Sequence, residues 1–217
     1  MPAAPTFLGL ARLTYAPGAT VPALRADGPT ILHVETGSLT VQTGEAAGQA
    51  TPTADGATVN EGQQLLIPAN TSFATRNDGT EPASVLRVVL YRSAPEPVAA
   101  PGITFQRLAA EVAPTLPSGR AFVTVNRLTL TAGASTVTRT QQADGPDLAY
   151  VEVGTLGLAG PGIDVTLSAG NTAFVDAGVD ARARNAGFGP LVLLVVSVST
   201  EAGDAGISTP EAGTPTS

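Results

Sequence analysis

The sequence contains an internal duplication, and this feature limits the possible fold more than any other. Four segments recur in the same order, and the spacings between them differ only in predicted loops. One match between Gly-rich segments can arise by chance, but four in register cannot. The chain therefore holds two repeats of one structural unit. The matching pairs are residues 11–20 with 126–135, 26–39 with 143–156, 62–79 with 170–187, and 84–91 with 191–198.

Each repeat has the pattern of an all-β domain. Short runs of Val, Ile, Leu and Thr are separated by Pro-Gly and Asp-Gly turns. In residues 31–41, Leu32 and Val34 share one face of the predicted strand, and His33 and Glu35 share the other. Many short, evenly spaced strands predict a sandwich or barrel.

The predicted boundaries follow from this pattern and from two segments of different composition. Between the repeats, a Pro-rich stretch precedes Phe105–Val112, whose sequence predicts a helix of one or two turns. Residues 43–61 are nearly free of large apolar side chains and are typical of a long exposed loop or a flexible hairpin tip. We predict a first barrel at 1–95, a linker with a short helix at 96–120, a second barrel at 121–200, and a low-complexity tail at 201–217.

Composition excludes several classes of function. The net charge is −7, and all 11 basic residues are Arg, so the chain lacks the basic surface that binds nucleic acid. The absence of Cys excludes disulfides, thiolate metal sites and cysteine nucleophiles. A single His, His33, argues against most transition-metal and Ser-His-Asp chemistry.

No segment predicts a membrane span or a signal peptide. The longest apolar run, Leu191–Val196, is far too short to cross a bilayer, and the first residues lack a basic stretch followed by an apolar one. We therefore expect a soluble chain, and the composition suits both a cytoplasmic protein and a secreted one whose leader has been removed.

The spacing of turn residues resembles the two-motif signature of the cupin superfamily. In the first repeat the first motif would begin at Gly18 and end at Gly37, and the second would run from Gly62 through Pro68 to Asn77. The second repeat carries the matching positions Gly133, Gly154, Gly170, Asp176 and Asn185. The resemblance covers residues 8–92 and 121–200. It implies two tandem cupin barrels, of the double-stranded β-helix or jelly-roll type, in one chain.

In the cupin family, histidines and a glutamate of these motifs hold a divalent metal inside the barrel. The positions that correspond to these ligands carry other residues here, so the resemblance implies degenerate metal sites and no metal cofactor. In the first repeat, these positions fall on Leu24, Ala26, Thr30 and Phe73, an apolar set. In the second they fall on Arg139, Gln141, Asp147 and Ala181, among which only Asp147 is a plausible metal ligand.

Arg139, Gln141 and Asp147 are candidates for a polar pocket in the second barrel. One interpretation is recognition of an anion or carboxylate by Arg139, with Asp147 positioning the guanidinium. The other is an internal ion pair that closes a barrel without a metal. A two-residue insertion leaves a second register open, in which the histidine positions fall on Gln141 and Ala143.

Other residues have structural interpretations. We expect His33 and its repeat partner Tyr150 to be half-buried outside the barrel interior, and Glu35 and Glu152 to lie on a solvated strand face. Asn77 and Asn185 are expected to hold turns through side-chain hydrogen bonds to the backbone. Arg182 and Arg184 are expected to face solvent or a neighbour. The expected core aromatics are Phe7, Phe73, Phe122, Phe174 and Phe188.

Two hypotheses of function remain open. The first is a non-catalytic bicupin with no catalytic residues and no cofactor, acting as a structural, self-associating or small-ligand-binding module. Its partners would be further copies of the chain or a small molecule, without nucleic acid. The alternative is a metal-independent isomerase, lyase or degraded dioxygenase, with Asp147 and Arg139 or Tyr150 performing acid–base chemistry.

Overall fold

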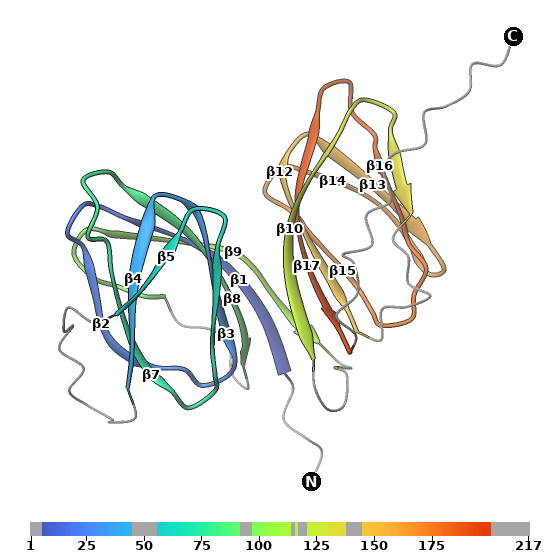
Figure 1. The fold of residues 1–217 in the computed structure, drawn as a ribbon. Helices are drawn as coiled ribbons and strands as arrows, with labels where there is room; N and C mark the ends of the chain where they lie inside the picture. Colours follow the sequence, from blue (N-terminus) through green and yellow to red (C-terminus); the bar gives the residue numbers. More distant parts are fainter. Residues whose placement is uncertain are drawn as a thin grey trace, which may run out of the picture. The chain divides into compact units, whose positions relative to one another are not determined.

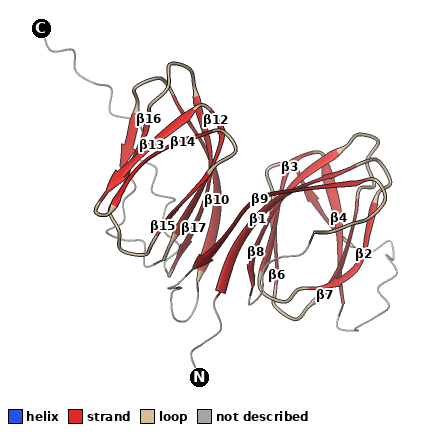
Figure 2. Cartoon of the chain, turned by 180° about the vertical axis from the view of Figure 1, so that it is seen from behind, coloured by secondary structure: helices blue, strands red, loops and turns tan. Residues whose placement is uncertain are grey.

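The computed structural model describes residues 6–44, 56–91, 97–113, 116, 121–137 and 145–200. Among these residues, 17 strands form four sheets (Figure 1). Figure 2 shows that the described chain contains strands and loops and no helix. The chain divides into two compact units, Met1–Val112 and Ala113–Ser217, and each unit holds two of the sheets.

The first unit is a barrel made of a five-stranded and a four-stranded sheet. The five-stranded sheet has the order β6-β3-β8-β1-β9, and the four-stranded sheet has the order β2-β7-β4-β5. Strands β1, β3 and β8 pair antiparallel and form the middle of the larger sheet. The strand bounds are β1 Thr6–Tyr15, β2 Thr20–Arg25, β3 Thr30–Thr36, β4 Ser38–Gly44, β5 Ala57–Asn60, β6 Gln64–Ile67, β7 Ser72–Arg76, β8 Ala83–Tyr91 and β9 Ile103–Ala113.

The second unit repeats this architecture with two four-stranded sheets. Their orders are β10-β17-β12-β15 and β11-β16-β13-β14. The strand bounds are β10 Phe122–Leu130, β11 Ser135–Val137, β12 Asp147–Val153, β13 Thr155–Gly160, β14 Ile163–Ser168, β15 Thr172–Val175, β16 Arg182–Asn185 and β17 Leu191–Ser199.

The two units match strand for strand, which confirms the predicted all-β fold of two tandem jelly-roll barrels. Taking β10 as the counterpart of β1, the strand orders of the paired sheets are identical, and β9 is an addition to the first unit. The pairing of the strands shifts the sequence match between the last strands of the two repeats, β8 and β17, by one residue. Tyr15 lies opposite Ala83, and its counterpart Leu130 lies opposite Leu191, so residue 83 rather than 84 corresponds to residue 191.

Each barrel encloses its own apolar core, and both sheets contribute to it. In the first barrel, Leu13 and Val85 from the larger sheet pack with Val41 and Phe73 from the smaller one. In the second barrel the corresponding core includes Leu156 and Leu193, which are 0% and 2% exposed. Alternating side chains on paired strands fill the space between the sheets, as expected for a jelly roll.

The helix predicted at Phe105–Val112 is wrong, because these residues lie in strand β9. Strand β9 extends the larger sheet of the first barrel next to β1, and the Ala16 amide donates to the Gly102 carbonyl oxygen at 2.8 Å where the two strands meet. Ile103 and Phe105 pack against the first core. The open edge of β1 supplies backbone partners, and this tertiary contact outweighs the weak helical preference of the segment.

Two further expectations are corrected within the described residues. Part of the segment 43–61, predicted as a loop, is strand β5, whose Asn60 lies opposite Ser38 of β4. Phe188, expected in the core, is fully exposed in the turn between β16 and β17, whereas Phe73 is buried as expected. Residues 45–55 and the tail 201–217 lie outside the described residues.

In the part of the chain that is described, no helix is long and apolar enough to cross a membrane.

Candidate functional site

The four positions of the first barrel that the cupin motifs would give to metal ligands belong to its core. Leu24 of β2 lies opposite Phe73 of β7, and Ala26 and Thr30 are each 1% exposed. Leu24, Ala26 and Phe73 are part of one apolar cluster. The Thr30 hydroxyl donates to the Gly28 carbonyl oxygen at 3.3 Å. These side chains leave only one oxygen atom, that of Thr30, which could act as a ligand at these positions.

The second barrel keeps one charged side chain at these positions. Ala181 is 3% exposed and joins the second core. Asp147 is nearly buried at the start of β12, where it lies opposite Ser197 of β17. Arg139 and Gln141 lie outside the described residues, so the polar pocket that would join them to Asp147 stays a prediction. Among the described residues, no group of three or more His, Asp or Glu side chains could hold a metal ion.

Asp147 is a buried carboxyl group with one unused oxygen. Burial raises its pKa above the usual 3.8, and a hydrogen bond with the Ser197 side chain partly opposes this shift. Its Oδ1 atom is buried and has no hydrogen-bond partner. A carboxyl group in this environment holds its proton to a higher pH than an exposed one, which is the property that a general acid needs.

The structure reveals a second charged side chain with a buried polar atom, Arg87, that the sequence comparison did not identify. Arg87 lies in the middle of β8, opposite Leu32 of β3 and Ala11 of β1. Leu32 belongs to the first core. Directly opposed residues of antiparallel strands project to the same face, so Arg87 projects into the first barrel. The sequence contained a signal for this position. Arg87 is the one charged residue in an apolar run, and it lies two residues from Val85 and Val89, on the same face of the strand.

Two tyrosines share the barrel interior with Arg87. The Tyr15 hydroxyl and Thr75 Oγ1 form a buried hydrogen bond of 3.0 Å between the two sheets. Burial raises the pKa of Tyr15, and the hydrogen bond with Thr75 and the positive charge of Arg87 both oppose this shift. Burial likewise raises the pKa of Tyr91, and the charge of Arg87 is the strongest opposing influence. The positive charge of Arg87 thus acts on both hydroxyls, and its side chain also forms a hydrogen bond with Tyr91.

The expectation of a solvated strand face at Glu35 and Glu152 is wrong, because both glutamates are ion-paired. The Arg12 guanidinium donates to both carboxylate oxygens of Glu35, at 2.6 and 2.8 Å. Arg127 repeats this arrangement with Glu152 at 2.9 and 3.3 Å. The glutamates are only 6% and 13% exposed. These repeated pairs link β1 to β3 across β8, and β10 to β12 across β17, and an arginine engages both carboxylate oxygens of each glutamate.

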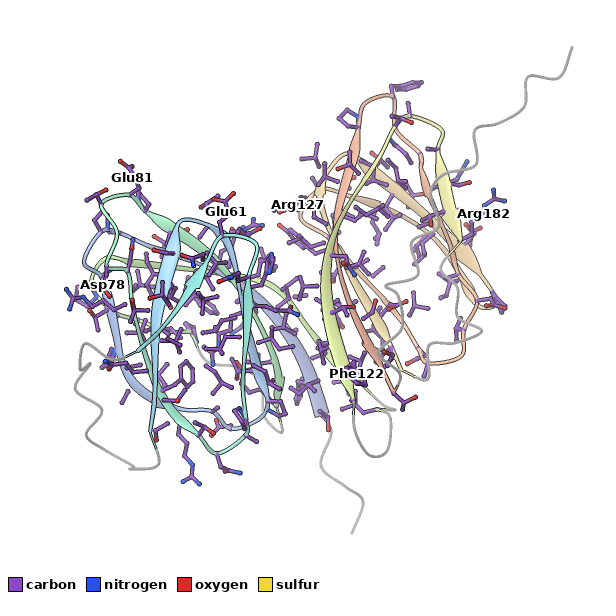
Figure 3. The ribbon with its side chains drawn as sticks, in the orientation of Figure 1. Glu61, Asp78, Glu81, Phe122, Arg127 and Arg182 are labelled. Carbon is purple, nitrogen blue, oxygen red and sulfur yellow. The ribbon has the colours of Figure 1, made fainter. Side chains whose placement is uncertain are left out.

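Other sequence-based expectations agree with the structure in part. His33 is half-buried as expected, whereas Tyr150 is 8% exposed and therefore buried. Of the expected core aromatics, Phe7, Phe122 and Phe174 are only partly buried. Arg182 and Arg184 are exposed, and Figure 3 shows Arg182 pointing away from its barrel. Gly18 and its repeat partner Gly133 both have φ near 74°, the left-handed conformation predicted for these turns.

Comparison with known proteins supports the fold and not a specific function. No protein-family model and no curated protein matches the sequence. The chain is similar to the structure of AerE from Microcystis aeruginosa, with a TM-score of 0.55 and 14% identity over 87% of this chain and 86% of that one. It is also similar to a mutant of oxalate decarboxylase from Bacillus subtilis, with a TM-score of 0.60 and 14% identity over 89% and 69% of the two chains.

Vicilin from hazelnut, Corylus avellana, is a further similar structure. Its TM-score is 0.57, with 13% identity over 90% of this chain and 76% of vicilin. Oxalate decarboxylase and vicilin are both two-barrel proteins of the cupin type, and the first is an enzyme whereas the second is a storage protein. Together with the matching sheets of its two units, this likeness shows that the chain has the bicupin fold.

Proposed function

We propose that this chain is a non-catalytic bicupin that binds a small molecule or further copies of itself, and that it does not carry out metal-dependent turnover. The supporting observation is the packing of the first barrel, in which Leu24 and Phe73 meet and Ala26 joins the same core. A divalent metal needs several nitrogen or oxygen ligands that converge on one point. Apolar side chains occupy three of the four positions where the cupin motifs would place these ligands, and Thr30 occupies the fourth.

Elemental analysis of the purified full chain tests this proposal. We expect manganese, iron, nickel and zinc at well below one ion per chain, and an unchanged melting temperature after treatment with a chelator. Stoichiometric metal, together with a fall of the melting temperature when it is removed, would contradict the proposal. Light scattering separates the two kinds of partner: a mass of 21.6 kDa at high concentration would remove self-association and leave ligand binding.

A metal-independent enzyme is the second candidate, and Asp147 is the observation that favours it. Its buried carboxyl group has a raised pKa and an oxygen atom without a hydrogen-bond partner. A screen of small metabolites, read as loss of substrate, tests this function. Any turnover found should disappear in Asp147→Asn, because an amide cannot exchange a proton in the same way. Turnover that persists in this variant would show that Asp147 is not the acid or base.

A further inference from the structure

We propose that the first barrel binds a small carboxylate through the Arg87 guanidinium, with the Tyr91 hydroxyl as a second donor. This inference deepens the proposed binding function and rests on it, since it names the chemical class of the ligand and the barrel that holds it. The site uses strand β8, whereas the positions implied by the cupin motifs lie on β2, β3 and β7 and in the turn after β2.

The strand pairing aims Arg87 at the interior. Its neighbours across the sheet, Leu32 and Ala11, are 2% and 7% exposed. Figure 1 shows β8 between β1 and β3, so the side chain starts from the middle of the larger sheet and not from an edge. The residue as a whole is only partly buried. The side chain therefore starts on the inner face of the larger sheet, and its Nε atom is buried.

The charge of Arg87 has no acidic partner among the described residues. Its Nε atom is buried and lacks a hydrogen-bond acceptor. Tyr91 is its hydrogen-bonding neighbour, and a hydroxyl group cannot neutralise a cation. An arginine side chain stays protonated at all ordinary pH values, so it cannot escape the unfavourable burial by losing its proton. Besides Arg87, two charges of opposite sign act on the pKa of Tyr91: Asp27 raises it and Arg107 lowers it.

The second barrel shows that the fold does not need a charge at this position. The residue that corresponds to Arg87 is Val195, which lies opposite Ala149 and packs against the second core. Tyr15 and Thr75 likewise correspond to Leu130 and Ala183, both of them apolar. The polar set in the first barrel is therefore a departure from the scaffold that the two repeats share. Polar side chains that replace apolar ones and leave a hydrogen-bond donor without an acceptor are expected at a binding site.

The geometry of the donors favours a carboxylate. The Nε edge of a guanidinium presents two parallel N–H groups, which match the two oxygens of one carboxylate. The adjacent Tyr91 hydroxyl can donate a third hydrogen bond. A cation would be repelled by the guanidinium, and a neutral molecule would leave its charge uncompensated. A small monocarboxylate therefore accepts a hydrogen bond from the Nε–H group of Arg87 and also neutralises the charge of its guanidinium.

Thermal denaturation of the full chain in acetate tests the inference. Sodium chloride replaces acetate so that ionic strength stays constant, and a sulfate series serves as a test of carboxylate selectivity. We expect the melting temperature of the wild type to rise by several degrees once acetate exceeds its dissociation constant by about 100-fold. The chain has three Tyr and no Trp, and two of the three, Tyr15 and Tyr91, lie in the first barrel, so tyrosine fluorescence should change over the same acetate range.

Three variants identify the site. Arg87→Val copies the residue of the second barrel and Arg87→Gln keeps the size of the side chain, and both should lose the acetate response. Tyr91→Phe should weaken binding by about tenfold, the effect of one hydrogen bond. Arg127→Gln is the control, because it removes the same charge outside the interior of the second barrel and should leave the response unchanged.

Each outcome decides the inference. An unchanged melting temperature and fluorescence in the wild type would overturn it, as would an acetate response that survives in a folded Arg87→Gln or Arg87→Val protein. A sulfate response equal to that of acetate would also overturn it, because the site would then recognise charge and not the carboxylate group. Metal analysis of the same samples keeps the two proposals separate. Stoichiometric metal contradicts the proposed function, whereas metal-free protein without an acetate response contradicts only the site at Arg87.

Discussion

Asn77 and Asn185 make the same three hydrogen bonds in the two barrels. Each side-chain amide donates to the last residue of the first strand, Tyr15 or Leu130, at 3.2 and 3.0 Å. Each also donates to the carbonyl oxygen four residues ahead, at 2.8 and 2.7 Å. Each Oδ1 accepts from the amide two residues ahead, at 2.9 Å. The asparagines are 0% and 3% exposed, so these bonds tie a turn to the barrel wall in a buried setting.

Replacing either asparagine by alanine should lower the free energy of unfolding by about 2–4 kcal/mol, because three hydrogen bonds disappear and buried backbone groups lose their partners. Urea denaturation followed by circular dichroism measures this change. Asn171→Ala is the control, since the printed bond of the Asn171 side chain, to the Ser168 carbonyl oxygen, is exposed. We expect less than about 1 kcal/mol for this control, and equal effects of all three variants would contradict the structural role.

The two Arg–Glu pairs should differ in strength although they repeat the same geometry. Arg12 and Glu35 are 23% and 6% exposed, and the Ser84 hydroxyl donates to Glu35 at 2.9 Å. Arg127 and Glu152 are 50% and 13% exposed. Glu35→Gln should therefore lower stability by about 2 kcal/mol, and Glu152→Gln by less than about 1 kcal/mol.

Urea titrations in low and high salt check this difference. High salt should reduce the effect of Glu152→Gln more than that of Glu35→Gln, because an exposed pair is screened more strongly. Equal losses in both variants, with the same salt dependence, would mean that burial does not set the strength of these pairs.

Gly28 should tolerate no side chain. A Cβ atom at this position would lie 1.6 Å from the Leu90 carbonyl oxygen, which is backbone and cannot rotate away. The Leu90 amide also donates to the Pro29 carbonyl oxygen at 3.1 Å, so the turn and β8 are held together at this place. Gly28→Ala should lower stability by about 3 kcal/mol or more.

Gly189→Ala is the matched control for Gly28→Ala, because a Cβ atom there meets nothing within 4 Å. Its thermal denaturation curve should coincide with that of the wild type to within about 0.5 kcal/mol. Similar losses in both variants would show that glycine is needed for backbone freedom and not for the close approach to β8.

Stability should depend on the ionisation of Asp147. Its pKa in the folded chain is raised above 3.8 by burial, so the folded state holds the proton more tightly than the unfolded state does. The resulting stabilisation is complete below pH 3.8 and is lost as the pH rises through the folded-state pKa. Asp147→Asn cannot ionise and should be more stable than the wild type at pH 7, with the difference disappearing toward pH 3.

Chemical denaturation at a series of pH values measures this difference. Asp164→Asn is the control, because it makes the same replacement at an exposed position on β14 of the same barrel. If the difference between the wild type and Asp147→Asn stayed constant from pH 3 to pH 7, Asp147 would not titrate in the way that its burial requires.

The sequence by itself determined the duplication, the all-β class and the turns. Alternation of apolar residues fixes which faces of a strand are buried, and glycine or asparagine is needed where the backbone turns, so these features depend on local chemistry. The matching bonds of Asn77 and Asn185 were therefore predictable. The degenerate positions Leu24, Ala26 and Phe73 could be placed from motif spacing, and they join the first core.

Only the tertiary structure decided which segments meet. Phe105–Val112 has residues that suit a helix, but the open edge of β1 offers backbone partners, and these make it a strand. Phe188 is apolar yet fully exposed in the turn between β16 and β17. The inward direction of Arg87 depends on its pairing with Leu32 and Ala11, which are distant in sequence. For Phe105–Val112 and Arg87, pairing between strands that are distant in sequence decides the outcome, although the position of Arg87 in its apolar run already hinted at its direction.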